Sequence, residues 1–396
     1  MRSLDLPDFP WDRIEPIKQR AARHEDGLID LSVGSPVDET PAVIREALRE
    51  ATDAHAYPAT AGSEELRQAI IDWFARRRGV TGLEHRNVLP TIGSKEFIAT
   101  APLMLGARPG DAVVVPVTAY PTYEIGARLA GAETVRSDDP AEWPANTRVV
   151  WVNSPGNPDG RVLGMDQLRA AVLRARELGA VIISDECYAE LNWQGADAAD
   201  RPASDGDGDG DGDSAPTPSI LDPRVLGGSR LDTLAVYSLS KQSNLAGYRA
   251  GLVAGCGRRI AQLLEARKHA GLMPPAPVQH AMAVALGDDA HVAEQRERYR
   301  ARRELLKPAL EAAGFRIDHS AAGLYLWATE GRPAIETLDR LAGIGILAAP
   351  GTFYGDPESQ HVRFALTASD DRMALAAERL ARFPSGEAIR SSAAAI

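Results

Sequence analysis

The stretch SLSKQSNLAGYRAG, Ser238 to Gly251, decides the fold prediction, because it places a lysine and an arginine directly after an apolar run. That run, LAVY, has the composition of a buried strand, and it ends on Ser-x-Ser-Lys. A lysine at the end of a buried strand loses hydration, which lowers its pKa and frees the amine to form a Schiff base with an aldehyde. Lys241 is therefore a candidate nucleophile, and the alternative is an ordinary lysine of a surface loop.

The residues around Lys241 could hold a phosphate. Ser238 and Ser240 supply two hydroxyl donors, and Arg249 supplies a guanidinium that can bind two oxygens. A second segment, IGSKE, enters an expected helix at KEFIATAPLML, so that its backbone N–H groups would face an anion. Alone, such a turn is more often a helix cap, but beside the Lys241 segment it predicts three more phosphate-binding residues, Gly93, Ser94 and Lys95.

Four apolar runs rich in β-branched residues alternate with helical patterns, at residues 111–116, 148–152, 180–186 and 234–240. A helix is expected between the second and third runs, in MDQLRAAVLRARELG, with its final glycine at the C-cap. This alternation predicts an α/β fold with a mostly parallel sheet between two layers of helices. In such sheets the ligand lies outside the carboxyl ends of the strands.

Polar residues follow these predicted strands. Asp185 ends the run VIISD and could pair with a protonated ring nitrogen, or it could cap a helix. Tyr188 could donate its phenol to a cofactor oxygen or lie in the core. Asn157, between Pro155 and Pro158 in NSPGNPDG, could donate to a phenolic oxygen or form a plain turn.

Two further residues complete a set of binding groups. Tyr120 in TAYPTY offers a ring that could stack on an aromatic cofactor. Arg363 in HVRFALT lies mid-strand among apolar neighbours, so a substrate carboxylate or a structural ion pair is expected there. An amine, a ring-nitrogen acid, a stacking ring, phenol-oxygen donors, a phosphate site and a carboxylate site are together what pyridoxal phosphate and its substrates require.

Composition excludes several other classes of function. The 396 residues carry a net charge of -11, which argues against binding to nucleic acid. No apolar run approaches the ~20 residues of a membrane helix. The N-terminus lacks the apolar core of a signal peptide, and two cysteines are too few for a disulfide framework. We therefore expect a cytoplasmic protein without membrane contact.

The composition changes most sharply at residues 195–218, where aspartate and glycine alternate. We expect a disordered or mobile acidic insertion there, because charge repulsion and backbone freedom oppose folding. A calcium loop is the alternative, but the glutamate at its twelfth position is missing, so no metal site is predicted. The insertion would interrupt a large domain of residues 41–287, and residues 1–40 with 288–396 would form a smaller α+β domain.

As a set, YPATAGSEELRQAI, NSPGNPDG, SDECY, SLSKQSNLAGYRAG and HVRFALT resemble the class I/II pyridoxal-phosphate aminotransferases of the aspartate-aminotransferase fold. The resemblance implies fold type I, a large domain with a mostly parallel sheet and a smaller α+β domain. It also implies that Lys241, Asp185 and Tyr188 are catalytic. The other implied cofactor contacts are Tyr120, Asn157, Ser238, Ser240 and Arg249. Asp159 stands where the family commonly has threonine.

The same resemblance implies three features that the residues alone do not. Tyr57 would reach the cofactor phosphate of a neighbouring subunit, so that the protein would be a homodimer with shared active sites. Gly34 would approach the substrate through its backbone, beside Asn157 and Arg363 as substrate contacts. The peptide bonds before Pro155 and Pro158 would both be cis.

A narrower set of strings, among them LPTIGSKE, RKHAGLMPPAPVQ, GLYLWAT and APGTFYG, resembles the actinobacterial N-succinyldiaminopimelate aminotransferases. This implies transfer of an amino group between glutamate/2-oxoglutarate and N-succinyl-LL-2,6-diaminopimelate/N-succinyl-2-amino-6-oxopimelate in lysine biosynthesis. Lys95 and Arg23 are candidates for the distal carboxylates.

Three alternatives to that reading stay open at this point. The first is another aminotransferase, for LL-diaminopimelate, aspartate or aromatic amino acids. The second is a C–S β-lyase that uses the same cofactor. The third is a ligand-sensing regulator, which is disfavoured because the segment before the first motif leaves no room for a DNA-binding domain.

Overall fold

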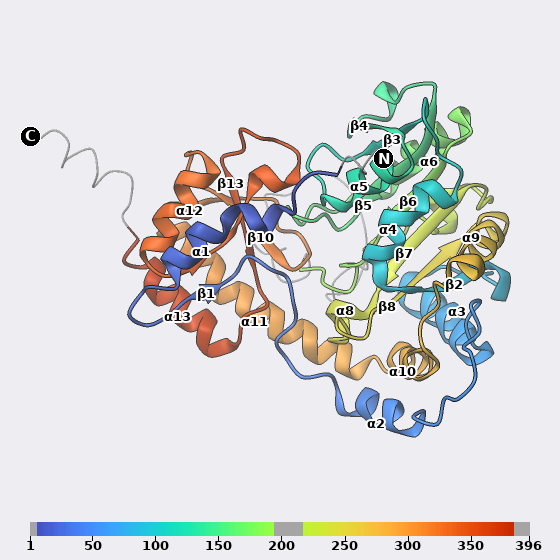
Figure 1. Ribbon diagram of the computed structural model, residues 1–396, viewed down its shortest axis with the longest axis horizontal. Coiled ribbons are helices and arrows are strands. Elements are labelled where there is room, and N and C mark those ends of the chain that lie inside the picture. The colour runs from blue at the N-terminus through green and yellow to red at the C-terminus, as the bar shows by residue number, and fades with distance from the viewer. Residues whose placement is uncertain (1–5, 194–216, 384–396) are drawn as a thin grey trace, which may run out of the picture.

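The computed structural model describes residues 6–193 and 217–383, in two lobes joined by a long helix, α11 (Ala290–Ala312) (Figure 1). The acidic tract that the sequence predicts as an insertion lies outside the described residues, apart from positions 217 and 218 at its end. In the described ranges no helix is long and apolar enough to cross a membrane.

The larger lobe is built on a seven-stranded mixed sheet. Its neighbouring strands are, in order, β2 (Val88–Ile92), β8 (Ala250–Gly255), β7 (Thr233–Ser238), β6 (Val181–Asp185), β5 (Thr147–Asn153), β3 (Ala112–Val115) and β4 (Glu133–Arg136). The strands from β7 to β4 are parallel to one another, and β8 is antiparallel to both β7 and β2. The parallel sheet predicted from the alternating pattern is therefore confirmed, with one reversed strand.

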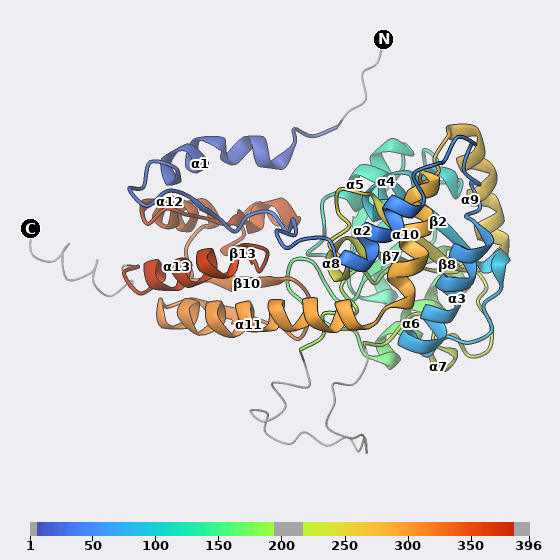
Figure 2. The same ribbon diagram turned by 90° about the horizontal axis from the view of Figure 1, so that it is seen from below.

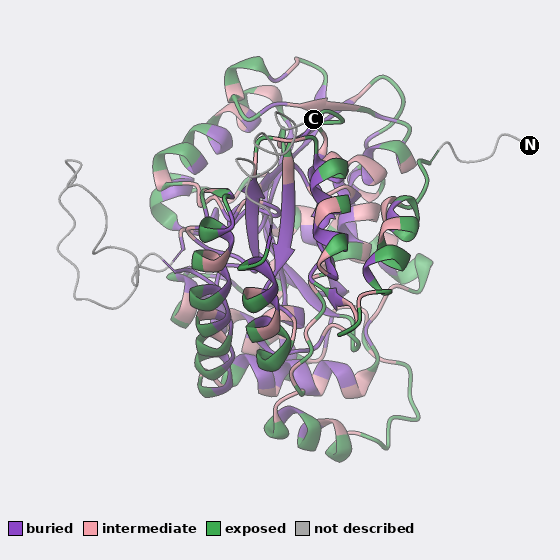
Figure 3. Cartoon of the chain, turned by 90° about the vertical axis from the view of Figure 1, so that its left-hand side faces the viewer, coloured by how far each residue is buried: buried purple, intermediate pink, exposed green. Residues whose placement is uncertain are grey.

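Helices cover both faces of this sheet, because the strands carry apolar side chains on both faces. Along β6, Ile182 packs into one core, and Val181 and Ile183 pack into the other. One layer consists of α2 (Ala42–Glu50), α3 (Glu64–Arg78), α6 (Met165–Leu178), α7 (Pro223–Leu226) and α10 (Ala276–Gly287). The other consists of α4 (Gly93–Met104), α5 (Thr122–Leu129) and α9 (Gly257–Ala270). Buried strands between exposed helix faces are evident in Figure 3.

The smaller lobe combines α11 with segments from both ends of the chain (Figure 2). Its four-stranded antiparallel sheet has the order β12 (Ala349–Pro350), β13 (His361–Ala365), β10 (Tyr325–Thr329) and β9 (Arg316–Asp318). A parallel pair is formed by β1 (Ile29–Asp30) and β11 (Ile346–Leu347). The helices are α1 (Glu15–Ala21), α12 (Ala334–Gly343) and α13 (Asp370–Leu380). Because Ile14, Ile29 and Leu31 share its core, the N-terminal segment belongs to this lobe.

Candidate active site

A cavity of about 240 Å³ lies where the carboxyl ends of the parallel strands face the smaller lobe. Both lobes contribute to its wall. Of the residues that the sequence proposes for the site, it is lined by Gly34, Ser94, Lys95, Tyr120, Asn157, Asp185, Tyr188, Ser238, Ser240, Lys241, Arg249 and Arg363. The structure therefore brings together residues that are separated by up to several hundred positions in the chain.

Lys241 lies on a one-turn helix, α8 (Leu239–Gln242), that directly follows β7. Its side chain is half-buried, and Nζ donates a hydrogen bond to the carbonyl oxygen of Gly34 at 2.8 Å. Burial lowers the pKa of Lys241, and the positive charges of Arg363 and Arg249 lower it further, against the opposing effect of Tyr325. A lowered pKa increases the fraction of neutral amine, the form that can attack an aldehyde or accept a proton.

One end of the cavity carries hydroxyls and cations. Ser238 caps α8 by accepting from the backbone N–H of Ser240 at 3.2 Å, and the two hydroxyl oxygens are 2.8 Å apart. The guanidinium of Arg249 lies against Gly93, the first residue of α4, where any Cβ would collide with it. Since Gly93 also has a φ of +68°, only glycine fits this position without strain.

Two cations, Lys95 and Arg249, line the cavity and affect each other electrostatically. Lys95 is exposed, and partial burial together with the charge of Arg249 lowers its pKa. Within residues 6–193 and 217–383, neither cation forms an ion pair with a carboxylate. Two unpaired cations beside two hydroxyls are suited to a doubly charged anion such as a phosphate ester.

Asp185, at the end of β6, also lines the cavity. Its Oδ2 accepts from the Tyr123 hydroxyl at 2.8 Å, and Oδ1 accepts from the backbone N–H of Cys187 at 3.1 Å. Both donors are neutral, so burial raises the pKa of Asp185. A protonated ring nitrogen would supply the missing positive charge. Tyr123, which stacks on Trp151, is a residue that the sequence analysis missed, although it lies in the TAYPTY motif.

Arg363, in the centre of β13, forms the wall contributed by the smaller lobe. Its guanidinium donates to Asn157 Oδ1 at 2.9 Å and to the Ser32 carbonyl oxygen at 2.7 Å, and it lies 3.8 Å from the centre of the Tyr325 ring. Tyr325 and Tyr188 are hydrogen-bonded through their hydroxyl oxygens at 3.3 Å. Tyr325, also missed from the sequence, lies so close to Gly34 that a Cβ there would collide with its phenol.

One expectation about a peptide bond turns out differently, and two exposed residues, Tyr57 and Arg23, do not line this cavity. The peptide bond before Pro155 is cis, but the one before Pro158 is not, so the prediction of two cis bonds is wrong for the second. The trans form is the lower-energy form before proline. Tyr57 is fully exposed and does not line the cavity of its own chain. Arg23 is also exposed and lies outside the cavity lining.

The chemistry of these groups fits pyridoxal phosphate. A carboxylate with neutral donors suits a protonated pyridine nitrogen, the hydroxyls and cations suit the phosphate, and the amine of Lys241 in the same cavity suits the aldehyde. Among the described residues no group of three or more histidine, cysteine or acidic side chains is placed to hold a metal ion. The fold and the cavity therefore define a pyridoxal-phosphate-dependent enzyme.

Comparison with known proteins identifies the family. The sequence matches the family "Aminotransferase class I and II" over residues 26–380, and the chain belongs to this family. Its members bind pyridoxal phosphate as a Schiff base to a lysine, and they share the aspartate-aminotransferase fold, as predicted. The protein is accordingly a pyridoxal-phosphate-dependent transaminase, with an amino acid and a 2-oxo acid as the substrates typical of the family.

Three similar proteins carry more specific names. The chain is 52% identical to 4-dedimethylamino-4-oxo-anhydrotetracycline transaminase OxyQ of Streptomyces rimosus, over 95% of this chain and 99% of the relative. It is 51% identical to probable aminotransferase Rv1178 of Mycobacterium tuberculosis, over 96% and 86% of the two chains. The structure of N-succinyldiaminopimelate aminotransferase from Mycobacterium tuberculosis is 27% identical, with a TM-score of 0.81 and coverage of 94% and 97%.

Proposed function

We propose that this transaminase moves an amino group between glutamate and N-succinyl-2-amino-6-oxopimelate, giving 2-oxoglutarate and N-succinyl-LL-2,6-diaminopimelate. The observation that carries the transamination is that Lys241 lines one cavity together with the cations Lys95 and Arg249 and with buried Asp185. The motifs shared with N-succinyldiaminopimelate aminotransferases, and the solved structure of that name, support the choice of substrate.

The residues of the cavity have distinct roles in this proposal. Pyridoxal phosphate, when bound, supplies an electron sink for the bonds at the substrate α-carbon. The phosphate would be held by Ser238, Ser240, Arg249 and the first turn of α4, which contains Gly93, Ser94 and Lys95. Asp185 would hold the ring nitrogen protonated. Asn157 and Tyr188 would donate to the phenolic oxygen, and Tyr120 would stack on the ring.

Lys241 would move the proton. Its amine would take the proton from the substrate α-carbon as a general base and would then give it up as a general acid. The Gly34 carbonyl, at 2.8 Å, gives this amine a fixed partner on the side of the smaller lobe. Burial favours the neutral base because it lowers the pKa of Lys241.

Arg363 would bind the substrate α-carboxylate. Its present acceptors, the Asn157 amide oxygen and the Ser32 carbonyl oxygen, are both neutral, so a carboxylate would be a stronger partner. For the distal carboxylates we propose Lys95, because it also lines a second cavity of about 540 Å³ that adjoins the first. Arg13 lines that second cavity as a further cation.

The same second cavity favours another candidate substrate, a polycyclic ketone. Its wall contains Trp11, whose ring centre lies 5.5 Å from that of Phe9 and 5.3 Å from that of Phe353. Flat aromatic walls suit a flat apolar ligand. The 52% identical relative is named a transaminase of such a ketone, 4-dedimethylamino-4-oxo-anhydrotetracycline, which makes this the second hypothesis.

A half-reaction assay distinguishes the candidates. The purified cofactor-loaded enzyme is mixed separately with N-succinyl-LL-2,6-diaminopimelate, LL-diaminopimelate, aspartate, aromatic amino acids and a 4-amino-anhydrotetracycline. Each amino donor that is accepted removes the visible absorbance of the lysine-bound cofactor. We expect the fastest loss with the succinylated compound. Faster loss with another donor would contradict the proposed substrate, and pyruvate release from cystathionine would indicate a C–S lyase.

We also propose that the protein works as a homodimer with shared active sites. The ring of Tyr57 is 100% exposed in the single chain, whereas the next most exposed tyrosine, Tyr248, is 37% exposed, and this contrast suits a contact of Tyr57 with a partner. Mixing two inactive variants, Tyr57→Ala and Lys241→Ala, tests this directly. Hybrid dimers would regain part of the activity because one site would have both residues intact. No recovery, or a monomer by light scattering, would contradict the proposal.

A further inference from the structure

The three residues that follow Lys241 are polar and buried, and the roles proposed above do not account for them. Gln242, Ser243 and Asn244 have exposed fractions of 2%, 0% and 8%. Burying polar side chains is unfavourable unless they are hydrogen-bonded. Their partners therefore show what this segment is built to contact, and two of these partners are side chains of α11.

A chain of hydrogen bonds runs from β7 through this segment to the first turn of α11. The Tyr237 hydroxyl donates to Gln242 Oε1 at 2.6 Å, and Gln242 Nε2 donates to Ser243 Oγ at 3.2 Å. Ser243 Oγ lies 2.8 Å from His291 Nε2, and His291 Nδ1 lies 3.1 Å from an Asp288 carboxylate oxygen. With the proton of His291 on Nδ1, every donor in this chain has an acceptor.

This serine, histidine and aspartate are not placed for nucleophilic chemistry. Ser243 is completely buried, so no substrate can reach its hydroxyl. The arrangement instead holds the backbone directly behind α8 in place. Because Tyr237 precedes Lys241 by four residues and Ser243 follows it by two, the hydrogen bonds hold the chain on both sides of the lysine.

Gln295, one turn further along α11, holds a second pair of segments together. Its Oε1 accepts from Asn244 Nδ2 at 2.9 Å, and its Nε2 donates to Asp38 Oδ2 at 2.8 Å. Asp38 follows Gly34 by four residues, and Gly34 supplies the carbonyl that accepts from Lys241. Helix α11 thus contacts both the segment that carries the amine and the segment that carries its acceptor.

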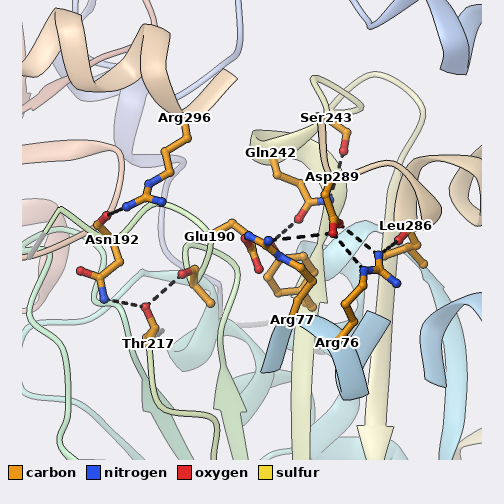
Figure 4. Close-up of polar contacts among 12 residues, drawn as sticks. Arg76, Arg77, Glu190, Asn192, Thr217, Gln242, Ser243, Leu286, Asp289 and Arg296 are labelled. Carbon is orange, nitrogen blue, oxygen red and sulfur yellow. Dashed lines mark hydrogen bonds and ion pairs between the residues drawn. The ribbon is translucent and has the colours of Figure 1, made fainter. Parts of the chain in front are cut away.

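The beginning of α11 is itself fixed to the larger lobe. Arg76, on α3, donates to the Leu286 carbonyl oxygen at 2.7 Å and to Asp289 at 2.9 and 3.0 Å. Arg77, also on α3, forms an ion pair with Glu190, in the segment that follows β6 (Figure 4). Figure 4 shows Gln242 and Ser243 near these groups, so the contact of α11 with the segment behind Lys241 lies at an anchored end of the helix.

We propose that His291 and Gln295 are positioning residues. Through their hydrogen bonds to Ser243 and Asn244 they fix the backbone next to Lys241 and thereby the position of its amine. This inference rests on the proposed role of Lys241. Since α11 continues into the smaller lobe, where Arg302 pairs with Asp38 at 2.6 Å, the position of that lobe is connected to the lysine through the same helix. Neither residue touches the cavity, so neither is proposed as a catalytic residue.

The test compares His291→Leu with His291→Gln in the cofactor-loaded enzyme. Leucine removes both hydrogen bonds, and glutamine can keep an acceptor near Ser243. The readout is the pH midpoint at which the visible absorbance of the lysine-bound cofactor changes. The charges of Tyr325, Cys187, Arg363 and Arg249 also affect the pKa of Lys241, and both variants leave these residues in place. Glu304→Ala, an exposed position on the same helix, is the matched control.

We expect His291→Leu to shift this midpoint by at least about 0.5 pH units and to lower kcat about tenfold, with a smaller change in KM. His291→Gln should recover most of both effects, and Glu304→Ala should change neither. A lower melting temperature in His291→Leu with an unchanged midpoint and kcat would overturn the proposal, because that is the pattern of a purely structural contact.

Two further variants keep the test decisive. If His291→Leu does not fold, Ser243→Ala breaks the same hydrogen bond from the other side and should give the same shift. The double variant His291→Leu/Ser243→Ala should shift the pH midpoint little more than either single variant, because each single variant already removes the same hydrogen bond. Independent, additive shifts would overturn the proposal. If Lys241 were not the cofactor lysine, Lys241→Ala would keep the visible band, which separates failure of the proposed function from failure of this inference.

Discussion

Lys241 and Lys95 line the same cavity, and burial lowers the pKa of both, yet their surroundings differ. Lys241 is half-buried just after a central strand, and its amine donates a hydrogen bond to the Gly34 carbonyl oxygen. Lys95 is exposed on the first turn of α4, with Arg249 nearby and the Phe9 ring centre 5.5 Å from its Nζ. A lowered pKa alone therefore does not identify the reactive lysine, and the position relative to the strand ends does.

The largest expected difference between the two lysines is in kcat when each is replaced by alanine. We expect Lys241→Ala to lower kcat by about 10³-fold or more, because it removes both the covalent attachment and the proton carrier. Lys95→Ala should stay within about tenfold of the wild type, since Arg249 and the serines still hold the phosphate. Steady-state transamination of glutamate measures both. Equal losses in the two variants would remove the distinction between them.

Arg363 should show the next largest effect, because its buried guanidinium lines the cavity and has only neutral acceptors. Arg363→Leu should lower kcat/KM for amino acids by about 10²-fold, and Arg363→Lys should restore little, because lysine lacks the two-pronged geometry. The control is a primary amine without a carboxylate, for which the variant and wild type should perform alike. A similar loss with that amine would mean that Arg363 is structural.

Lys95 should matter for the far end of the substrate. Lys95→Met should reduce kcat/KM for N-succinyl-LL-2,6-diaminopimelate about tenfold more than for alanine, an amino donor that has no second carboxylate. Arg23→Met is the matched control because Arg23 is an exposed cation outside the cavity lining, and it should change neither value. Equal effects of Lys95→Met on both donors would assign Lys95 to the phosphate alone.

Asp185 should give the smallest effect, seen in the stability of the cofactor-free protein. Burial raises its pKa above the ordinary 3.8, so the folded state keeps a proton that the unfolded state releases. The free energy of unfolding therefore falls as pH rises from 3.8 through the raised pKa. Compared with Asp185→Asn, the melting temperature of the wild type should fall by about 1–3 °C more over that range. A constant difference between the two proteins would contradict this.

Much of the cavity could be predicted because its chemistry follows strand ends. Asp185 follows β6 and Lys241 follows β7, and parallel strands bring their carboxyl ends to one edge. The contacts from the other lobe could not be predicted in this way. Gly34 and Lys241 are hydrogen-bonded although they are 207 residues apart in the chain, and Ser32 and Arg363 although they are 331 residues apart. No local sequence pattern can show such a pairing.

The residues that were missed share a physical reason. In the sequence, Tyr123 and Tyr325 cannot be told from ordinary aromatic residues of the core. Only the fold shows what their hydroxyl groups contact. In the segment that follows Lys241, the sequence indicates a role for Arg249 alone, because the buried polar side chains of Ser243 and Asn244 contact α11, which is distant along the chain. Tyr57 is the reverse case, where the motif assigns a role that a single chain cannot display.

The most direct test of the central claim is to fix the cofactor in place and locate it. The loaded enzyme is reduced with borohydride, digested, and its peptides are sequenced by mass spectrometry. We predict that the cofactor mass is found on Lys241, and that it is lost from the protein when Lys241→Ala is treated in the same way. Cofactor on Lys95 or any other lysine of the wild-type enzyme would contradict the account.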